Sequence, residues 1–300
     1  MMPLHIPVLL AETMEYMQIK KGGIYCDLTL GDGSFSKAIL KRGAKVFAFD
    51  KDERQIKRAK TTLKSFGKNI KYFQEDFADF RSVLAMEKIS KVDGIIADIG
   101  VSTEQILNGE FGFSYQKNGP IDMRMDRNKT FSALELLTKY PEDILIEIFK
   151  KYSNEPKAKK IAHQIYIDRK TLQTTFQLNS SIEKITRSVK SKSRIYQAIR
   201  IVVNGELESL KTLLDDCAYG LKQNGKVAII SYHSLEDRIV KHGFSFGAKS
   251  CVCPTEFDRC LCNKKAVLKI LTKKPILPSK AEILNNPKSR SAKLRVAQRI

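Results

Sequence analysis

Short apolar runs alternate with amphipathic segments along the first hundred residues of the chain. Four runs have the length and composition of buried strands, and the segments between them repeat apolar residues at helical spacing. The predicted strands are 24–29, 45–50, 70–73 and 92–98, and the predicted helices are 35–42, 53–66 and 80–87. Strands and helices that alternate in this way favour right-handed βαβ crossovers, so they predict a parallel sheet with helices on both faces.

This alternation stops after residue 98 and resumes near residue 195. A loop rich in Gly, Asn and Pro leads into four predicted helices, at 131–138, 143–152, 158–169 and 180–189. A long helix is then predicted at 195–218, followed by strands at 225–232, 267–271 and 293–297. The pattern therefore predicts an α/β fold with a doubly wound, mostly parallel sheet, formed by residues 1–105 and 195–300, and an all-helical insertion at 106–194.

Composition and charge suggest a partner and a compartment for this fold. Of the 300 residues, 42% are hydrophobic, which is sufficient for a globular core. No run approaches the roughly 18 apolar residues of a membrane span, and the N-terminus lacks the features of a signal peptide, so we expect a cytoplasmic protein with reduced thiols. Lys and Arg number 53 against 33 Asp and Glu, which gives a net charge of +20. This excess favours a nucleic-acid partner, although a solvated Lys-rich surface would give the same count.

A glycine-rich turn follows the first predicted strand. Gly31 and Gly33 let the backbone approach a ligand closely and adopt positive φ. A dinucleotide-binding turn has a third glycine, and here that position is Ser36, so the turn favours a nucleoside without a pyrophosphate. Taken alone, such a turn is more often only a turn.

Acidic residues follow the next three strands. Asp50 is placed to accept hydrogen bonds from the two hydroxyls of a ribose, Asp76 and Phe77 to bracket an adenine, and Asp98 ends the fourth strand. Each acid has an alternative role as a helix cap. Because parallel strands bring their carboxyl ends to one edge of a sheet, the set together predicts a nucleoside-cofactor site, and S-adenosylmethionine fits it better than NAD.

Several longer strings are specific enough to identify a family. The chain resembles the bacterial 16S rRNA (cytosine-N4) methyltransferases nearly from end to end, and least between about 127 and 190. The matching strings are HIPVLLAE at 5–12, DIGVSTEQ at 98–105, GPIDMRMD at 119–126, QAIRIVVNGEL at 197–207, ISYHSLEDR at 230–238 and NPKSRSAKLR at 286–295.

This resemblance implies a cytoplasmic enzyme that uses S-adenosylmethionine to methylate a cytosine at the decoding site of small-subunit rRNA. It implies cofactor contacts at Gly33, Ser34, Phe35, Asp50, Phe77, Asp98 and Gln105. The chain departs from the family where Ser34 and Phe35 replace a Gly-His pair and Asn118 replaces an Asp. If the family uses backbone groups at positions 34 and 35, the first change is tolerable. If the imidazole made a contact, affinity for the cofactor falls.

The residue that acts on the cytosine amine is less clearly indicated. The amine is a poor nucleophile, so its methylation needs an acceptor for an N–H bond. Asp122 is the first candidate, Asp126 the second, and His233 is a candidate to orient the base or relay a proton. The alternatives are ion pairs of the two aspartates with Arg124 and Arg127, and a hydrogen-bonded structural histidine.

Arginines within the family-like strings are the candidate RNA contacts. They are Arg124, Arg238, Arg290 and Arg295, each of which has a possible structural role instead. The target base must leave its stack to reach a methyl donor, and Phe111, Phe113 and Tyr115 are candidates for the walls of its pocket.

A cluster of cysteines lies near the C-terminus. Cys251, Cys253, Cys260 and Cys262 form two C-x-C pairs within twelve residues, which suggests a zinc site. The spacing within each pair is tighter than is usual for zinc, and this favours reduced thiols on a loop.

Two other functions remain open at this point. One is a non-catalytic RNA-binding factor in ribosome assembly with a weakened cofactor site. The other is a DNA or protein amine methyltransferase, which the missing Pro-Pro-aromatic motif after Asp98 disfavours. The partner is small-subunit rRNA or the assembled small subunit, and the pattern does not fix an oligomeric state.

Overall fold

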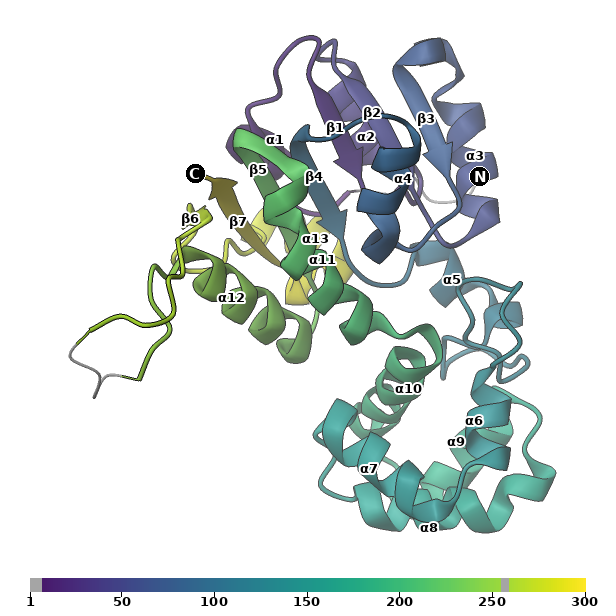
Figure 1. Ribbon diagram of the computed structural model, residues 1–300. Helices are drawn as coiled ribbons and strands as arrows, with labels where there is room; N and C mark the ends of the chain where they lie inside the picture. The colour runs from purple at the N-terminus through teal and green to yellow at the C-terminus, as the bar shows by residue number, and fades with distance from the viewer. Residues whose placement is uncertain (1–6, 255–258) are drawn as a thin grey trace. The chain divides into compact units, whose positions relative to one another are not determined.

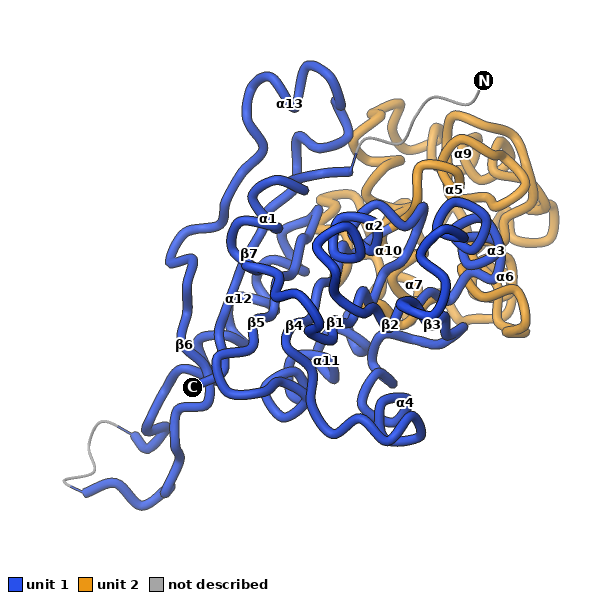
Figure 2. Tube along the Cα trace, turned by 90° about the horizontal axis from the view of Figure 1, so that it is seen from above, with its two compact units in different colours: residues 1–100, 207–300 blue, residues 101–206 orange. Residues whose placement is uncertain are grey.

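The computed structural model describes residues 7–254 and 259–300. These residues form two compact units, one of residues 1–100 with 207–300 and one of residues 101–206 (Figure 2). Among the described residues, no helix has the length and apolar content needed to cross a membrane.

The first unit is built on a seven-stranded sheet (Figure 1). The strands are β1 (Ile24–Asp27), β2 (Lys45–Phe49), β3 (Ile70–Phe73), β4 (Val92–Asp98), β5 (Leu221–Ser231), β6 (Leu268–Ile270) and β7 (Lys293–Arg299). Their order is β3-β2-β1-β4-β5-β7-β6. The pairs from β3 to β5 are parallel, and β7 runs antiparallel to β5 and β6. The predicted doubly wound, mostly parallel sheet is confirmed.

Two layers of helices cover the two faces of this sheet. The helices are α1 (Leu10–Met17), α2 (Ser34–Leu40), α3 (Glu53–Thr62), α4 (Phe80–Met86), α11 (Glu206–Gly220), α12 (Ser234–Ala248) and α13 (Lys280–Asn285), with short 3₁₀ turns η1 (Lys64–Asn69), η2 (Phe77–Asp79) and η5 (Pro287–Ser291). Buried side chains of α1, α2 and α3 form one hydrophobic cluster with the sheet, and those of α4, α11 and α12 form another.

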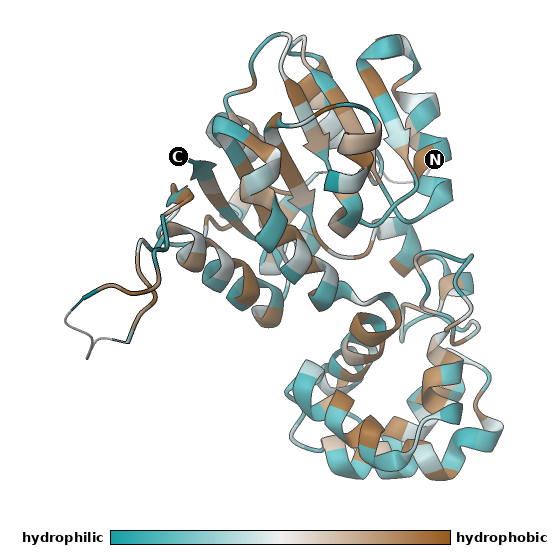
Figure 3. Ribbon diagram, in the orientation of Figure 1, coloured by the Kyte–Doolittle hydropathy of each residue, from teal (hydrophilic) through white to brown (hydrophobic). Residues whose placement is uncertain are grey.

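Side chains of the central strands alternate between these two clusters. In β5, Val227 and Ile229 belong to the cluster with α11, whereas Ala228 and Ile230 belong to the cluster with α1. The period of two residues follows from the pleat of a strand, and burial on both faces explains why the sequence shows an unbroken apolar run (Figure 3).

The second unit is helical and has a hydrophobic core of its own. Its helices are α5 (Thr103–Leu107), α6 (Ala133–Lys139), α7 (Glu142–Ser153), α8 (Ala158–Asp168), α9 (Thr175–Glu183) and α10 (Val189–Asn204), with 3₁₀ turns η3 (Gly109–Phe111) and η4 (Arg169–Thr171). The helix predicted at 180–189 instead begins at Thr175 and ends at Glu183.

The long helix predicted at 195–218 is two helices. Gly205 has φ 62° and ends α10 in the left-handed conformation, which glycine adopts without a steric penalty. Residues 190–194 belong to α10 as well, and α11 starts at Glu206. The predicted border at 194/195 therefore lies inside a helix of the second unit, whose limits are 101 and 206.

Asn204 ties the loop at 119–126 to α10. Its Oδ1 accepts a hydrogen bond from the Met125 amide at 2.8 Å, and its Nδ2 donates to the Met123 carbonyl at 2.8 Å. The Asn204 side chain is buried, and Met123 is held at φ 57°, an unusual value for a residue with a side chain. The Asn204 carboxamide thus pairs with the carbonyl of the strained Met123 and with the amide of Met125.

We expect Asn204→Ala to lower the free energy of unfolding by about 1–3 kcal/mol, because buried backbone groups lose their partners. The measurement is chemical denaturation monitored by circular dichroism. Asn128→Ala, at an exposed position two residues after this loop, is the matched control and should leave the stability unchanged. Equal stabilities of the two variants would contradict the role given to Asn204.

Candidate functional site

The carboxyl ends of four parallel strands meet at one edge of the sheet. Strand order reverses between β1 and β4, and in open α/β sheets ligands bind beside the carboxyl ends at such a switch point. The structure brings to this edge the candidate cofactor residues of the first unit, which are Gly31, Gly33, Ser34, Phe35, Asp50, Phe77 and Asp98.

The glycine-rich turn after β1 is fixed by its backbone conformation and by hydrogen bonds, one of which reaches Asp50. Gly31 has φ 51° and Gly33 has φ 84°. A Cβ atom on Gly33 would lie 2.8 Å from Cδ1 of Leu63, so both conformation and space require glycine there. The amide of Gly31 donates to Oδ2 of Asp50 at 2.9 Å, which joins the turn to the end of β2.

Ser34 and Phe35 begin α2 directly after this turn. Phe35 is buried in the hydrophobic cluster with α1 and α3, so its ring packs in the core. Because the Phe35 side chain is buried, only the backbone groups of this residue can contact a ligand. Ser36 occupies the position of the third glycine in a dinucleotide turn. Its hydroxyl donates a hydrogen bond to Oδ2 of the buried Asp27, with an O–O distance of 2.6 Å. Desolvation by burial raises the pKa of Asp27 to about 6, although its hydrogen bonds with Ser36 and Thr29 act in the opposite direction.

Asp50 lies at the end of β2 with both carboxylate oxygens engaged. Oδ2 accepts from Gly31, and Oδ1 accepts from the Asp52 amide at 2.9 Å. Burial raises the pKa of Asp50 to about 6, and these backbone donors offset only part of the effect. Each carboxylate oxygen accepts about two hydrogen bonds, so Asp50 retains capacity for two ligand hydroxyls.

Asp76 and Phe77 follow β3 and are stabilised by Lys51, which sequence reasoning missed. Lys51 Nζ lies 2.6 Å from Asp76 Oδ2 and 5.5 Å from the centre of the Phe77 ring. Ser209 donates its hydroxyl to the same carboxylate at 2.7 Å. Burial opposes ionisation of Asp76, but the charge of Lys51 and the hydrogen bonds outweigh it and lower its pKa. Lys51 directly follows Asp50 in the sequence, so its place beside the candidate site could have been inferred from that adjacency.

Asp98 is oriented by two residues that the sequence reasoning also missed. Its amide donates to Oγ1 of Thr29 at 2.6 Å, and its Oδ1 accepts from the hydroxyl of Tyr232 at 2.8 Å. Burial and the nearby Asp98 carboxylate raise the pKa of Tyr232, so it remains a hydrogen-bond donor. The register that pairs Asp98 with Ile230 places Tyr232 just beyond the end of β5.

Three candidate residues lie in the helical unit and are engaged within it. Gln105 is buried, and its Oε1 accepts from the Ser102 amide at 2.9 Å as part of a capping box for α5. Asp122 accepts from Arg124 at 2.6 Å (Nε) and 2.9 Å (NH2). Burial acts to raise the pKa of Asp122, but the hydrogen bonds and the charge of Arg124 outweigh it. The pKa of Asp122 therefore lies below its usual value. Asp126 Oδ1 accepts from the Asn128 amide at 2.9 Å.

His233 acts as the N-terminal cap of α12. Its Nδ1 accepts from the Glu236 amide at 3.4 Å, and Glu236 Oε2 accepts from the amides of Tyr232 and His233 at 2.8 and 3.2 Å. The Nε2 atom lies 3.0 Å from Glu236 Oε1. The structure thus shows a capping role for His233, while its role in orienting the base or relaying a proton stays a prediction.

The four candidate RNA-binding arginines divide into two pairs. Arg238 and Arg290 are exposed. Arg124 forms the ion pair with Asp122, and Arg295 is only 7% exposed, with Nε donating to Asp237 at 2.6 Å. The expectation that Arg295 contacts RNA is corrected here, because a buried guanidinium held by a carboxylate cannot reach a phosphate.

The aromatic residues expected to line a base pocket are also placed differently. Phe111 and Phe113 are buried in the core of the helical unit. Tyr115 packs edge-on against Tyr196, with ring centres 5.9 Å apart. Phe111 and Phe113 therefore stabilise the helical core, whereas Tyr115 is only partly buried beside it.

The whole chain matches known proteins. Residues 2–300 match a family model described as the MraW methylase family. A protein of Caldicellulosiruptor saccharolyticus named "Ribosomal RNA small subunit methyltransferase H" is 45% identical over 305 residues, covering 99% of each chain. A protein of the same name from Clostridium botulinum (strain Loch Maree) is 44% identical over 310 residues, also with 99% coverage of each. A third, from Clostridioides difficile, is 40% identical over 310 residues, again with 99% coverage of each.

We expect Asp50→Ala to weaken binding of S-adenosylmethionine roughly 10²-fold or more, because two charge-assisted hydrogen bonds to the ribose are lost. In the unaltered protein the affinity should fall as the pH is lowered through about 6, where Asp50 takes up a proton. Calorimetric titration between pH 5 and 8 measures both effects.

Asp216→Ala removes a surface carboxylate that pairs with Arg81 and serves as the control. Asp50→Asn should abolish that part of the pH dependence which arises from this carboxyl. Unchanged affinity in Asp50→Ala would exclude the ribose contact.

Proposed function

This chain belongs to the MraW methylase family, and on that premise we propose that it methylates the N4 amine of a cytosine at the decoding site of small-subunit rRNA, with S-adenosylmethionine as the methyl donor. The observation that carries the proposal is the identity of 40–45% over 99% of the chain to proteins named as small-subunit rRNA methyltransferases.

The residues at the carboxyl edge of the sheet fit S-adenosylmethionine. The donor set suits a nucleoside, because Asp50 retains acceptor capacity for two hydroxyls and Gly31 and Gly33 allow close backbone approach. Ser36 is committed to Asp27, which agrees with a ligand that has no pyrophosphate. When bound, the cofactor supplies a methyl group on a sulfonium. We assign Asp50 to the ribose, Phe77 to the adenine, and backbone groups at 33–35, with Asp98 and Gln105, to the rest of the ligand.

Asp122 remains our first candidate for the acceptor that binds the amine. The lone pair of this amine is delocalised into the cytosine ring, so an acceptor that binds an N–H favours the pyramidal nitrogen of the transition state. A lowered pKa keeps Asp122 ionised at neutral pH, and the two bonds from Arg124 fix its orientation. Asp126 and Asp98 follow as candidates, while the capping role of His233 makes it the weakest.

The net charge of +20 supports an RNA substrate. We assign phosphate contacts to the exposed Arg238 and Arg290, and recognition of the RNA to the helical segment at 106–194. The partner that we propose is small-subunit rRNA, either free or within the assembled small ribosomal subunit, in the cytoplasm.

The alternative of a non-catalytic assembly factor rested on Ser34 and Phe35. Since the Phe35 ring is buried in the core, it does not obstruct the ligand edge. Asp50 and Asp98 remain at that edge, so no observation favours the alternative.

Mass-spectrometric mapping of methylated cytosines in small-subunit rRNA tests the proposal directly. Cells that lack the protein should lose one N4-methylcytosine at the decoding site, and the purified protein should restore it in vitro. The same assay on naked rRNA and on assembled subunits identifies which of the two is the substrate. Loss of a different modification, or of none, would contradict the assigned activity.

A pair of variants separates the two roles of Asp122. If Asp122 binds the amine, Asp122→Ala should lower the single-turnover rate at saturating RNA by about 10²–10⁴-fold. Arg124→Ala breaks the same ion pair but keeps the carboxylate, so its effect on the rate should be much smaller.

If Asp122 only holds the loop through Arg124, the two variants should behave alike, with losses of melting temperature, RNA binding and rate together. A normal rate in Asp122→Ala would leave Asp126 and Asp98 as the acceptors to test.

A further inference from the structure

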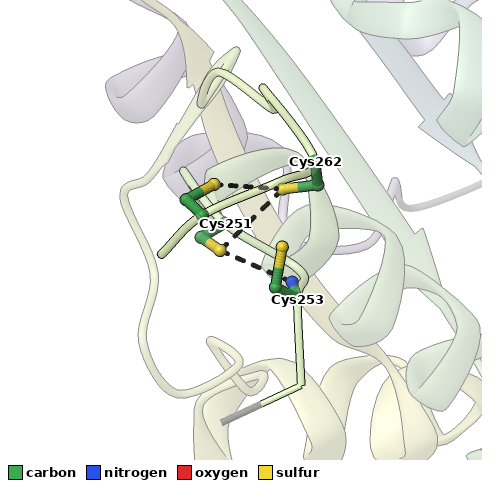
Figure 4. Close-up of side chains that lie close together, drawn as sticks. Cys251, Cys253 and Cys262 are labelled. Atoms are coloured by element: carbon green, nitrogen blue, oxygen red, sulfur yellow. Dashed lines mark hydrogen bonds between the residues drawn. The ribbon is translucent and has the colours of Figure 1, made fainter. Parts of the chain in front are cut away.

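Four cysteine sulfurs converge on the loop that joins α12 to β6 (Figure 4). Cys251 and Cys253 lie on the outgoing arm of this loop, and Cys260 and Cys262 lie on the returning arm. All four Sγ atoms are within 4.8 Å of one another. Cys262 Sγ is 3.8 Å from Cys251 Sγ and 3.5 Å from Cys260 Sγ. This convergence of four ligands is unrelated to the cofactor edge of the sheet.

We propose that Cys251, Cys253, Cys260 and Cys262 bind one zinc ion, which fixes the structure of this loop. In a tetrahedral Zn²⁺ site with Zn–S bonds of ~2.3 Å, neighbouring sulfurs lie about 3.8 Å apart. The separations in the structure agree with that spacing. They are well beyond the ~2.0 Å of a disulfide bond. A tetrahedral set of sulfurs selects zinc or iron, and zinc suits a site with no redox role.

The loop has no hydrophobic core to hold it. In the described parts of 249–267, no residue is buried, and Leu261 and Val252 are 72% and 43% exposed. At its base, the loop is held by a hydrogen bond from the Val267 amide to the Gly247 carbonyl at 2.8 Å. A chain segment that buries no apolar surface needs another source of order, and a bound metal supplies it in small metal-binding loops.

Backbone amides donate to the sulfurs, as is expected around bound thiolates. The Leu261 amide lies 3.2 Å from Cys253 Sγ, and the Val252 amide lies 3.4 Å from Cys262 Sγ. Both bonds run between the two arms of the loop. Such donors disperse the negative charge of thiolates and orient them toward a metal.

The charge of the segment also matches the proposed site. Four thiolates with Zn²⁺ carry two negative charges. Residues 249–267 contain four cationic side chains and two acidic ones, a balance of two positive charges. All four coordination positions are filled by the protein, so the ion is structural and takes no part in methyl transfer.

Zinc content of the full-length protein is the first test. After purification in reducing buffer and exhaustive dialysis, elemental analysis and native mass spectrometry should find one zinc ion per chain. Cys251→Ser and Cys262→Ser should each lose it. Cys217→Ala, which removes a buried thiol of α11, should keep it. Replacement by Co²⁺ should give the visible absorption of a tetrahedral thiolate site, absent from both serine variants.

Trypsin digestion is the second test, because Lys249, Arg259 and Lys264 are potential cleavage sites on the loop. Chelation of the metal, or either serine substitution, should speed cleavage there by roughly tenfold or more, while circular dichroism and affinity for S-adenosylmethionine stay unchanged. Metal-free protein with four reactive thiols, disulfide-linked cysteines, bound iron, or equal zinc in the serine variants would each overturn the proposal. None of these outcomes would bear on the methyltransferase activity.

Discussion

Burial of the central strands on both faces is the constraint on which the first unit depends. Alternate side chains of β1, β2, β4 and β5 enter two separate hydrophobic clusters, so these strands have no face for a polar side chain. Polar groups of these four strands therefore lie toward the strand ends. At the carboxyl end they accumulate as Asp27, Asp50 and Asp98, and the candidate cofactor site lies there.

Asp50 and Asp98 stabilise the fold at the edge where we propose that the ligand binds. Asp50 joins the turn after β1 to the start of α3, and Asp98 joins β4 to Thr29 and Tyr232. The same burial that raises the pKa of Asp50 strengthens any hydrogen bond that it accepts, because few water molecules compete. A site assembled from such groups is held in place before the ligand arrives, which lowers the entropic cost of binding.

The helical unit has a core built by its helices together with the segment at 111–123, and one of its ion pairs lies within the loop at 119–126. Asp122 and Arg124 form a two-bond ion pair beside the strained Met123, and Asn204 holds the backbone of that loop against α10. An ion pair of this kind orients a carboxylate and keeps it ionised. Both properties suit an acceptor for an amine, and both also suit a purely structural contact.

The sequence by itself determined the alternation of strands and helices along the chain and the edge at which the acids meet. Strand periodicity is local, and parallel strands bring their carboxyl ends together whatever the details of packing. The resemblance of long strings then identified the family. Tertiary structure alone decided which side chains are engaged, since a partner distant in sequence leaves no local pattern. It buried Arg295 against Asp237 and placed Phe111 in a core. It also brought the two C-x-C pairs to one point, because the path of the intervening chain sets the distance between them.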